Sequence, residues 1–338
     1  ELGGLDAAEQ EKETIRLANE EAAQPFDLEH GPLWRAQLVR LNAAEHVLLF
    51  TMHHIISDGW SMGVLVREVS ALYQAYMNGA DSSLTELPIQ YADFAVWQRA
   101  YLQGAVLERQ LQYWREQLAG APPVLQLPSD HPRPAIQNYR GAHVPVRFST
   151  ELTTSLKELS RREGVTLFMT LLAVWQVLLS RYTGQKDVVV GSPIANRRRS
   201  EIEGLIGFFL NNLVLRAQLQ AHQSGRELLR QVREVCLGAY AHQDVPFEML
   251  VEELRPERDM SHSPLFQVTF TWQNAPFEVS QWPGIEVSAV AVERSTSKFD
   301  VTLVMGEFEE EIAGSVEYNT DLFERETIER LMGHYERL

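Results

Sequence analysis

The spacing of hydrophobic and polar residues predicts helices and strands in both halves of the chain. Helical spacing predicts helices at residues 6–22, 61–77, 91–118, 152–163, 166–182 and 226–240, and a closing helix after the sequence TDLFERE. Strand-like runs predict strands at residues 34–38, 47–54, 143–148, 187–190, 265–272, 285–292, 301–308 and 312–318. The pattern is typical of an α/β protein, an α+β sandwich in which helices cover sheets.

The first two strands are predicted to form an antiparallel hairpin. Trp34, Ala36 and Leu38 alternate with polar residues, which indicates a half-buried strand. Residues 47–54 are apolar on both parities, as expected for a strand covered on both faces. This second strand ends in His53 and His54, which would point to opposite faces, so only one of them can face a cleft.

A proline-rich segment divides the pattern into two parts. Residues 121–135 read APPVLQLPSDHPRPA and hold five prolines, so they cannot continue a helix. We expect this segment to be the crossing between two α/β layers, with one domain at 1–140 and another at 141–338. A length of 338 residues agrees with two domains.

Composition and charge exclude several classes of protein. The formal net charge of -16 would repel a polyanion, so nucleic acid is not expected as a partner. No apolar run reaches the roughly 20 residues that span a bilayer, and the first residues lack the pattern of a signal peptide. Cys236 is the only cysteine, which excludes an internal disulfide and a multi-cysteine metal site. No glycine-rich nucleotide loop is present. We therefore expect a cytoplasmic protein that binds neither nucleic acid nor membrane.

The residues with the clearest chemical potential lie in the string TMHHIISDGWS, residues 51–61. An imidazole at the end of a strand can accept a proton near neutral pH without large tuning of its pKa. Gly59 allows close approach of the backbone and can offer its N–H to an oxyanion.

Other interpretations of these residues remain open. A single histidine after an apolar strand is usually a hydrogen-bonded core residue. His54 and Asp58 are both metal-ligand types, but no third ligand follows at a metal-site spacing, so we expect no metal. Asp58 could act as a base, although an aspartate before a helix is more often a cap or a salt-bridge partner.

Taken together, these residues resemble a known family. HHIISDGWS matches the HHxxxDG signature of the condensation domains of nonribosomal peptide synthetases. Further similar motifs follow in family order: YADFAVWQR at 91–99, IGFFLNNLVLR at 206–216, AYAHQDVPFE at 239–248, RDMSHSPLFQVTF at 258–270 and STSKFDVTL at 295–303. The two family motifs that precede HHxxxDG are absent, so we expect the chain to be N-terminally truncated.

The resemblance implies both a fold and a reaction. It implies two chloramphenicol-acetyltransferase-like lobes arranged in a V, with the active site at their interface. It implies amide-bond formation between a donor acyl or peptidyl thioester and the amine of an acceptor aminoacyl thioester. His54 would be the catalytic residue, as a base or as a group that positions the amine. Ser57, and Trp60 and Ser61 after Gly59, resemble the subtype that joins two L-configured residues. Heterocyclising relatives carry a different pattern, and epimerising relatives are disfavoured by SDGWS.

The resemblance also implies partners and supporting residues. Upstream donor and downstream acceptor carrier domains would supply 4'-phosphopantetheine arms, an adenylation domain would be a neighbour, and the chain itself would bind no cofactor. His53, Asp58 and Gly59 would support the motif, with Asp58 paired to an arginine of the second lobe. We choose Arg197 as that arginine; the alternative is that residues 197–199 form a solvated basic patch. The motif at His242 is expected to be structural.

Two rival functions remain. One is a freestanding acyltransferase that uses an acyl-CoA donor, since related families share an HxxxDG core. The other is a catalytically silent module that recruits carrier or tailoring proteins, although the intact His54, Asp58 and Gly59 favour catalysis.

Overall fold

The computed structural model describes residues 1–338 except residues 258, 274–281, 283, 291–294 and 309. Its helices are α1 Ala7–Ala23, α2 Gly59–Met77, α3 Tyr91–Tyr101, α4 Gly104–Leu118, α5 Thr150–Glu163, α6 Leu167–Thr183, α7 Ser200–Glu203, α8 Gly225–Ala241, α9 Phe247–Leu254 and α10 Arg325–Arg337, with a 3₁₀ helix η1 at His54–Ile56. Its strands are β1 Trp34–Arg40, β2 His46–Met52, β3 Gly141–Arg147, β4 Asp187–Ile194, β5 Asn211–Gln218, β6 Val268–Gln273, β7 Val301–Phe308 and β8 Glu311–Asn319.

The described residues fall into two compact units that do not follow chain order. The first unit takes residues from 1–95, 197–209 and 275–293, and the second takes residues from 96–196, 210–274 and 294–338. Residues 96–140 therefore group with the later part of the chain, and the short segment around α7 groups with the earlier part. A division into lobes at residue 140 stays a prediction.

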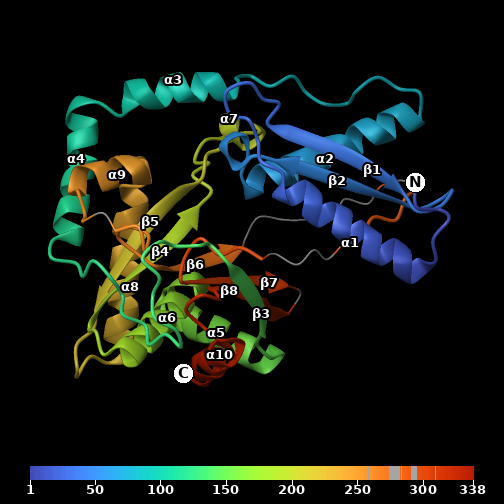
Figure 1. The fold of residues 1–338 in the computed structure, drawn as a ribbon. Coiled ribbons are helices and arrows are strands. Elements are labelled where there is room, and N and C mark those ends of the chain that lie inside the picture. Colours follow the sequence, from blue (N-terminus) through green and yellow to red (C-terminus); the bar gives the residue numbers. More distant parts are fainter. Residues whose placement is uncertain (258, 274–281, 283, 291–294, 309) are drawn as a thin grey trace. The chain divides into compact units, whose positions relative to one another are not determined.

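The second unit is built on a six-stranded mixed sheet with the order β3-β8-β7-β6-β4-β5. Neighbours pair antiparallel except β4 with β6 and β6 with β7, which are parallel. Helices α5, α6, α8 and α10 contact this sheet or one another (Figure 1). Helix α6 contributes the fully buried Leu172, Trp175 and Leu179 to the core. The α/β class predicted from the sequence is thus confirmed.

The first unit contains the predicted hairpin, in which β1 and β2 pair antiparallel with Trp34 opposite Met52. The sequence predicts that the second strand is covered on both faces, but in the structure one face of the hairpin is covered. Arg35 on β1 forms an ion pair with Glu21 of α1, so α1 covers the face that carries Arg35. On the opposite face Leu38 is 65% exposed and pairs across the strands with Leu48, which is 58% exposed. The expectation that the second strand is buried on both faces is therefore wrong.

Other predicted elements differ in detail. The single helix predicted at 91–118 is divided into α3 and α4, because the backbone is extended at Gln103, with a φ of -140° and a ψ of 162°, and turns into α4 at Gly104 with a φ of +52°. Strand β5 and helix α9 are not predicted by the sequence pattern. Residues 286–290 of the strand predicted at 285–292 form no regular element, and residues 291–292 lie outside the described residues.

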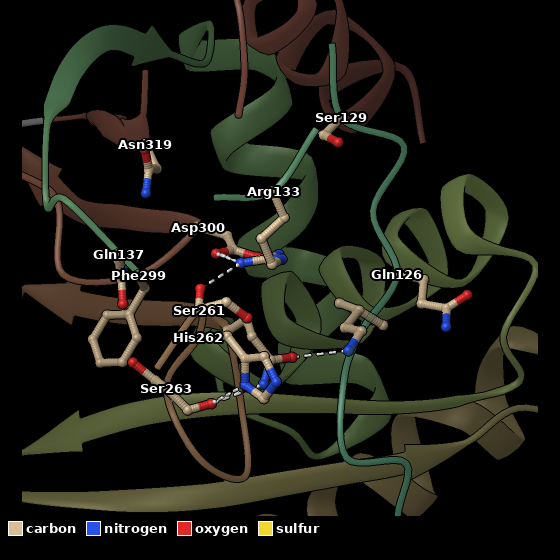
Figure 2. A network of polar contacts seen from close by, with 12 residues as sticks. Gln126, Ser129, Arg133, Gln137, Ser261, His262, Ser263, Phe299, Asp300 and Asn319 are labelled. Carbon is tan, nitrogen blue, oxygen red and sulfur yellow. Dashed lines mark hydrogen bonds and ion pairs between the residues drawn. The ribbon is translucent and has the colours of Figure 1, made fainter. Parts of the chain in front are cut away.

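The proline-rich segment belongs to the second unit and is fastened to the rest of that unit by polar contacts (Figure 2). Arg133 forms a two-point ion pair with Asp300, and its Nη1 lies 2.9 Å from Asp300 Oδ1 and 3.2 Å from the carbonyl oxygen of Ser261. Leu125 N donates to Gln267 Oε1 at 2.8 Å. Parts of two motifs noted in the sequence, around Ser261, Gln267 and Asp300, thus hold the proline-rich segment in place.

We expect Arg133→Ala to lower the free energy of unfolding by about 3 kcal/mol. The side chain of Asp300 is 2% exposed, so the substitution leaves a buried carboxylate without its cation. Chemical denaturation measures the change. Arg147→Ala is the matched control: Arg147 also pairs with a carboxylate, but the side chain of its partner Glu311 is 32% exposed, so the charge left behind stays in contact with water and we expect a loss of at most about 0.5 kcal/mol. Equal losses in the two variants would contradict this account.

A second prediction concerns the thiol of Cys236 on α8, which is 0% exposed. Burial raises its pKa from about 9 to about 12. Between these values the unfolded chain loses the proton and the folded chain keeps it, so stability falls as the pH rises. We expect the thiol's contribution to be about 1.4 kcal/mol per pH unit above pH 9.

Unfolding titrations across this pH range test the thiol, with Cys236→Ala as the control. The variant should show a shallower loss of stability than the parent. Equal slopes, or rapid reaction of the native thiol with Ellman's reagent near neutral pH, would show that the thiol is not buried as described.

Within the described part of the chain, no single helix has the length and apolar character to cross a membrane, although α5 and α6 together, bent by 102°, meet those two criteria as a pair.

Candidate active site

The two histidines of the motif lie just beyond β2, in a turn of 3₁₀ helix rather than on the strand. His53 is the N-cap of η1, and its Nδ1 accepts a hydrogen bond from Ile55 N at 3.0 Å. Its ring also packs against Phe26, with ring centroids 5.7 Å apart. The prediction that the two rings point to opposite faces of a strand is therefore wrong, because neither histidine lies on the strand. His53 caps the turn that carries His54.

His54 is exposed and is held by one hydrogen bond through Nδ1, which lies 2.7 Å from the carbonyl oxygen of Ser57. A carbonyl oxygen can only accept a hydrogen bond, so we place the hydrogen of the neutral ring on Nδ1. Nε2 then carries the free lone pair. This tautomer suits a ring that must accept a proton or a hydrogen bond from a substrate.

Asp58 is buried and caps α2. Its Oδ1 accepts hydrogen bonds from Ser61 N at 2.8 Å and from Ser61 Oγ at 2.7 Å. Its Oδ2 accepts a hydrogen bond from Phe209 N at 3.0 Å. A carboxylate with these partners is already fully engaged, so its contacts favour the predicted structural role over that of a base.

Arg197 forms the predicted pair with Asp58. Its Nη2 lies 3.1 Å from Asp58 Oδ1, and the two side chains are 1% and 2% exposed. Nη1 donates to the carbonyl oxygens of Ile202 and Leu205 at 2.6 and 2.7 Å. The guanidinium lies 4.0 Å from the centre of the Phe209 ring. The alternative of a solvated basic patch does not apply to Arg197, which groups with the first unit.

Burial and the neighbouring carboxylate shift the pKa of the Arg197 guanidinium in opposite directions. Burial lowers the pKa of the Arg197 guanidinium below its ordinary value, and Asp58 opposes that change. Because an arginine pKa begins so high, the group keeps its charge at neutral pH. The pair is therefore a buried ion pair supported by backbone hydrogen bonds, which is stable only while both partners are present.

Ser61, which the sequence singled out only for its resemblance to one subtype, is a further buried member of this site. Its hydroxyl lies 2.7 Å from Asp58 Oδ1 and 2.9 Å from the carbonyl oxygen of Gly207, either of which can take its hydrogen. It accepts hydrogen bonds from Arg197 Nη2 at 2.9 Å and Gly207 N at 3.1 Å. Its place three residues after the cap Asp58 is the signal that could have identified it.

The part of the chain that the structure describes gives no support for a special role of Gly59 or for a metal site. Gly59 is exposed at the start of α2, and a Cβ there would meet nothing within 4 Å, so packing does not require glycine. Its expected approach to a substrate stays a prediction. Among the residues that the structure describes, no group of three or more His, Cys, Asp or Glu is placed to hold a metal ion.

The motif around His242 lies between α8 and α9. His242 Nδ1 lies 2.8 Å from the carbonyl oxygen of Gly238, and its ring stacks on Tyr113 with centroids 4.1 Å apart. The carbonyl oxygen of His242 accepts a hydrogen bond from Trp114 Nε1 at 2.9 Å. These contacts agree with the structural role expected for this motif.

Comparison with known proteins decides the family. The family model "Condensation domain" matches residues 1–338. This chain belongs to the condensation-domain family of nonribosomal peptide synthetases. It is 53% identical over 340 residues to one of the linear gramicidin synthase proteins of Brevibacillus parabrevis, covering 100% of this chain and 7% of that protein. The chain thus spans a small part of this curated relative.

Solved structures support the same family for this condensation domain. The X-domain from teicoplanin biosynthesis superimposes with a TM-score of 0.90 at 30% identity, covering 97% of this chain and 75% of that one. A four-domain nonribosomal peptide synthetase bound to AMP and glycine superimposes with a TM-score of 0.83 at 27% identity, covering 98% and 26%. Condensation domains are acyltransferase-type catalytic domains, and the chain has that fold.

Proposed function

We propose that this condensation domain forms an amide bond between a donor acyl or peptidyl thioester and the amine of an acceptor aminoacyl thioester. Both substrates would be carried on the phosphopantetheine arms of carrier domains, upstream for the donor and downstream for the acceptor, with an adenylation domain as a neighbour. The observation that carries the proposal is the 2.7 Å contact of His54 Nδ1 with the carbonyl oxygen of Ser57, from which we infer a free lone pair on Nε2 of the exposed ring.

The reaction needs little more than one imidazole. The acceptor amine nitrogen attacks the thioester carbon, the C–S bond breaks as the tetrahedral adduct collapses, and the thiolate leaves. The amine proton moves to Nε2 of His54 and then to the leaving sulfur, so the ring ends unchanged. Whether Nε2 removes the proton or holds the amine in place, its lone pair must be free. A thioester is already activated, so correct placement of the two arms supplies much of the rate.

The finer features of the proposal come from the family resemblance. They are two lobes, 1–140 and 141–338, that form a V around a tunnel, no cofactor bound by the chain itself, a cytoplasmic location and the subtype that joins two L-configured residues. Ser57, one of the residues that suggest this subtype, lies in the loop that orients His54. Trp60 Nε1 in the same motif donates to the carbonyl oxygen of Glu203 at 2.8 Å.

A reconstituted transfer assay tests the proposed function. The full-length protein is mixed with a carrier that bears a defined aminoacyl donor and a carrier that bears a defined acceptor, and the dipeptidyl product is detected by mass spectrometry. Product with L-donors and much less product with D-donors supports both the reaction and the subtype. Product with acyl-CoA donors and no carrier would instead support the freestanding acyltransferase.

A recruitment module is the second candidate, favoured by the likeness to the X-domain, which has also been solved in a complex with OxyB. Such a module would bind a carrier or a tailoring protein without forming product. Carrier binding in the absence of any transfer would support this candidate over the enzyme.

A further inference from the structure

The short segment 207–209, from the motif IGFF, is fixed to the network around Asp58. Gly207 N donates to Ser61 Oγ at 3.1 Å, and Phe209 N donates to Asp58 Oδ2 at 3.0 Å. The residue between these two anchors is Phe208. Its backbone therefore has little freedom, which fixes the direction of its Cα–Cβ bond.

A third contact fixes the carbonyl group of Phe208. Tyr91 Oη donates to the carbonyl oxygen of Phe208 at 2.8 Å. Burial raises the pKa of Tyr91, and Asp58 raises it further, so the phenol keeps the hydrogen that it donates. A Cβ at Gly207 would lie 2.2 Å from Tyr91 Cδ2, so the tyrosine ring packs directly on the glycine and leaves no room for a side chain.

The ring of Phe208 packs against His54. The two ring centroids are 5.3 Å apart and their planes meet at 88°, which is a favourable arrangement for an aromatic pair. His54 is exposed; Cβ tethers its ring at Cγ, and the hydrogen bond to Ser57 holds Nδ1. With these two ring atoms held, the imidazole can still rock about the line that joins them. The edge-type contact with the ring of Phe208 restricts this motion.

We propose that Phe208 is a positioning residue, which holds the His54 ring so that Nε2 stays aimed at the acceptor amine. The proposal rests on the proposed function. On this proposal the network of Asp58, Ser61 and Tyr91 contributes to catalysis as well as to stability, because it fixes the backbone of Phe208. A ring held by two contacts keeps the geometry that proton transfer requires, whereas a ring held by one contact spends less time in it.

Kinetics of Phe208 variants in the transfer assay test the proposal. We expect Phe208→Ala to lower kcat about tenfold, which corresponds to about 1.4 kcal/mol, with the KM for both carriers unchanged. Phe208→Tyr keeps the aromatic ring and should retain most of the parent kcat. Phe208→Leu keeps the apolar bulk without the ring, so it should fold like the parent and still lose activity.

Tyr182 provides a control. Its ring packs against His334, with centroids 5.9 Å apart and planes at 51°, and neither residue is part of the network around His54. Tyr182→Ala removes an aromatic–histidine contact of similar size and should leave kcat within about twofold of the parent protein. A loss as large as that of Phe208→Ala would mean that both substitutions act through the fold.

A spectroscopic measurement separates this proposal from the proposed function. In the free protein, nuclear Overhauser contacts should join the ring protons of His54 and Phe208, and Phe208→Ala should shift and broaden the His54 ring signals. Absence of the contacts overturns the positioning role whether or not the protein forms an amide. A parent protein that is active together with a fully active Phe208→Ala variant also overturns it. An inactive parent protein that shows the contacts contradicts the proposed function alone.

Discussion

Replacing His54 with alanine is expected to lower the rate of amide formation at least 100-fold while carriers bind as before. The substitution removes the Nε2 lone pair, and a positioned acid–base group typically contributes at least that factor. His54 is exposed, and within the described part of the chain its side chain makes one hydrogen bond, so its loss should change the free energy of unfolding by less than about 1 kcal/mol.

Single-turnover transfer between loaded carriers measures this rate. His46→Ala is the control, because His46 is also an exposed histidine of the same hairpin but lies at the far end of β2. It should transfer at the parent rate. If His54→Ala transferred as fast as the control, the imidazole would have no part in the chemistry.

Breaking the buried ion pair is expected to produce the largest loss of stability. Asp58→Ala leaves the guanidinium of Arg197, whose side chain is 1% exposed, without a counter-charge, and we expect the free energy of unfolding to fall by about 3–5 kcal/mol. Arg197→Ala leaves the Asp58 carboxylate buried and should cost a similar amount. The double variant removes both charges and should cost less than the sum of the two single losses by at least about 1 kcal/mol.

Denaturant titrations of the four proteins complete this double-mutant cycle. The control cycle uses Arg325 and Glu329, an ion pair on α10 whose side chains are 52% and 49% exposed, for which we expect a coupling of at most about 0.5 kcal/mol. Additive losses for Asp58 and Arg197 would mean that the pair does not form in solution.

Much of the fold follows from the sequence where local signals are strong. The amphipathic helices and their caps, such as Thr166 before α6 and Ser224 before α8, are fixed by neighbours a few residues apart. The sequence also predicts the hairpin β1–β2, but not its buried face. Both faces of β2 carry apolar residues, and only the position of α1 decides which of them is covered.

The predicted elements that failed are those in which local pattern and tertiary contacts compete. Helical spacing continues across residues 102–103, but the chain is extended at Gln103 and enters the next helix through Gly104, whose φ is +52°. Strand β5 begins at two asparagines, which disfavour strands in isolation. Asn211 nevertheless begins the strand, because its side-chain amide donates to the carbonyl oxygens of Gln243 and Val245.

At the site, residue types were predictable and their geometry was not. The spacing of the motif indicated His54 and Asp58, and the need to balance a carboxylate suggested Arg197. The roles of Ser57 and Ser61 depend on a turn of 3₁₀ helix and on a segment about 150 residues away in the chain. No local pattern encodes contacts of that kind.

The central claim is that His54 presents an unprotonated Nε2, and the nitrogen spectrum of its ring tests this directly. The protein is labelled with ¹⁵N-histidine, and the His54 signals are assigned by their loss in His54→Gln. Long-range ¹H–¹⁵N correlations, recorded at a pH where the ring is neutral, distinguish the two tautomers. We predict a hydrogen on Nδ1 and a free lone pair on Nε2, while a hydrogen on Nε2 would contradict the account.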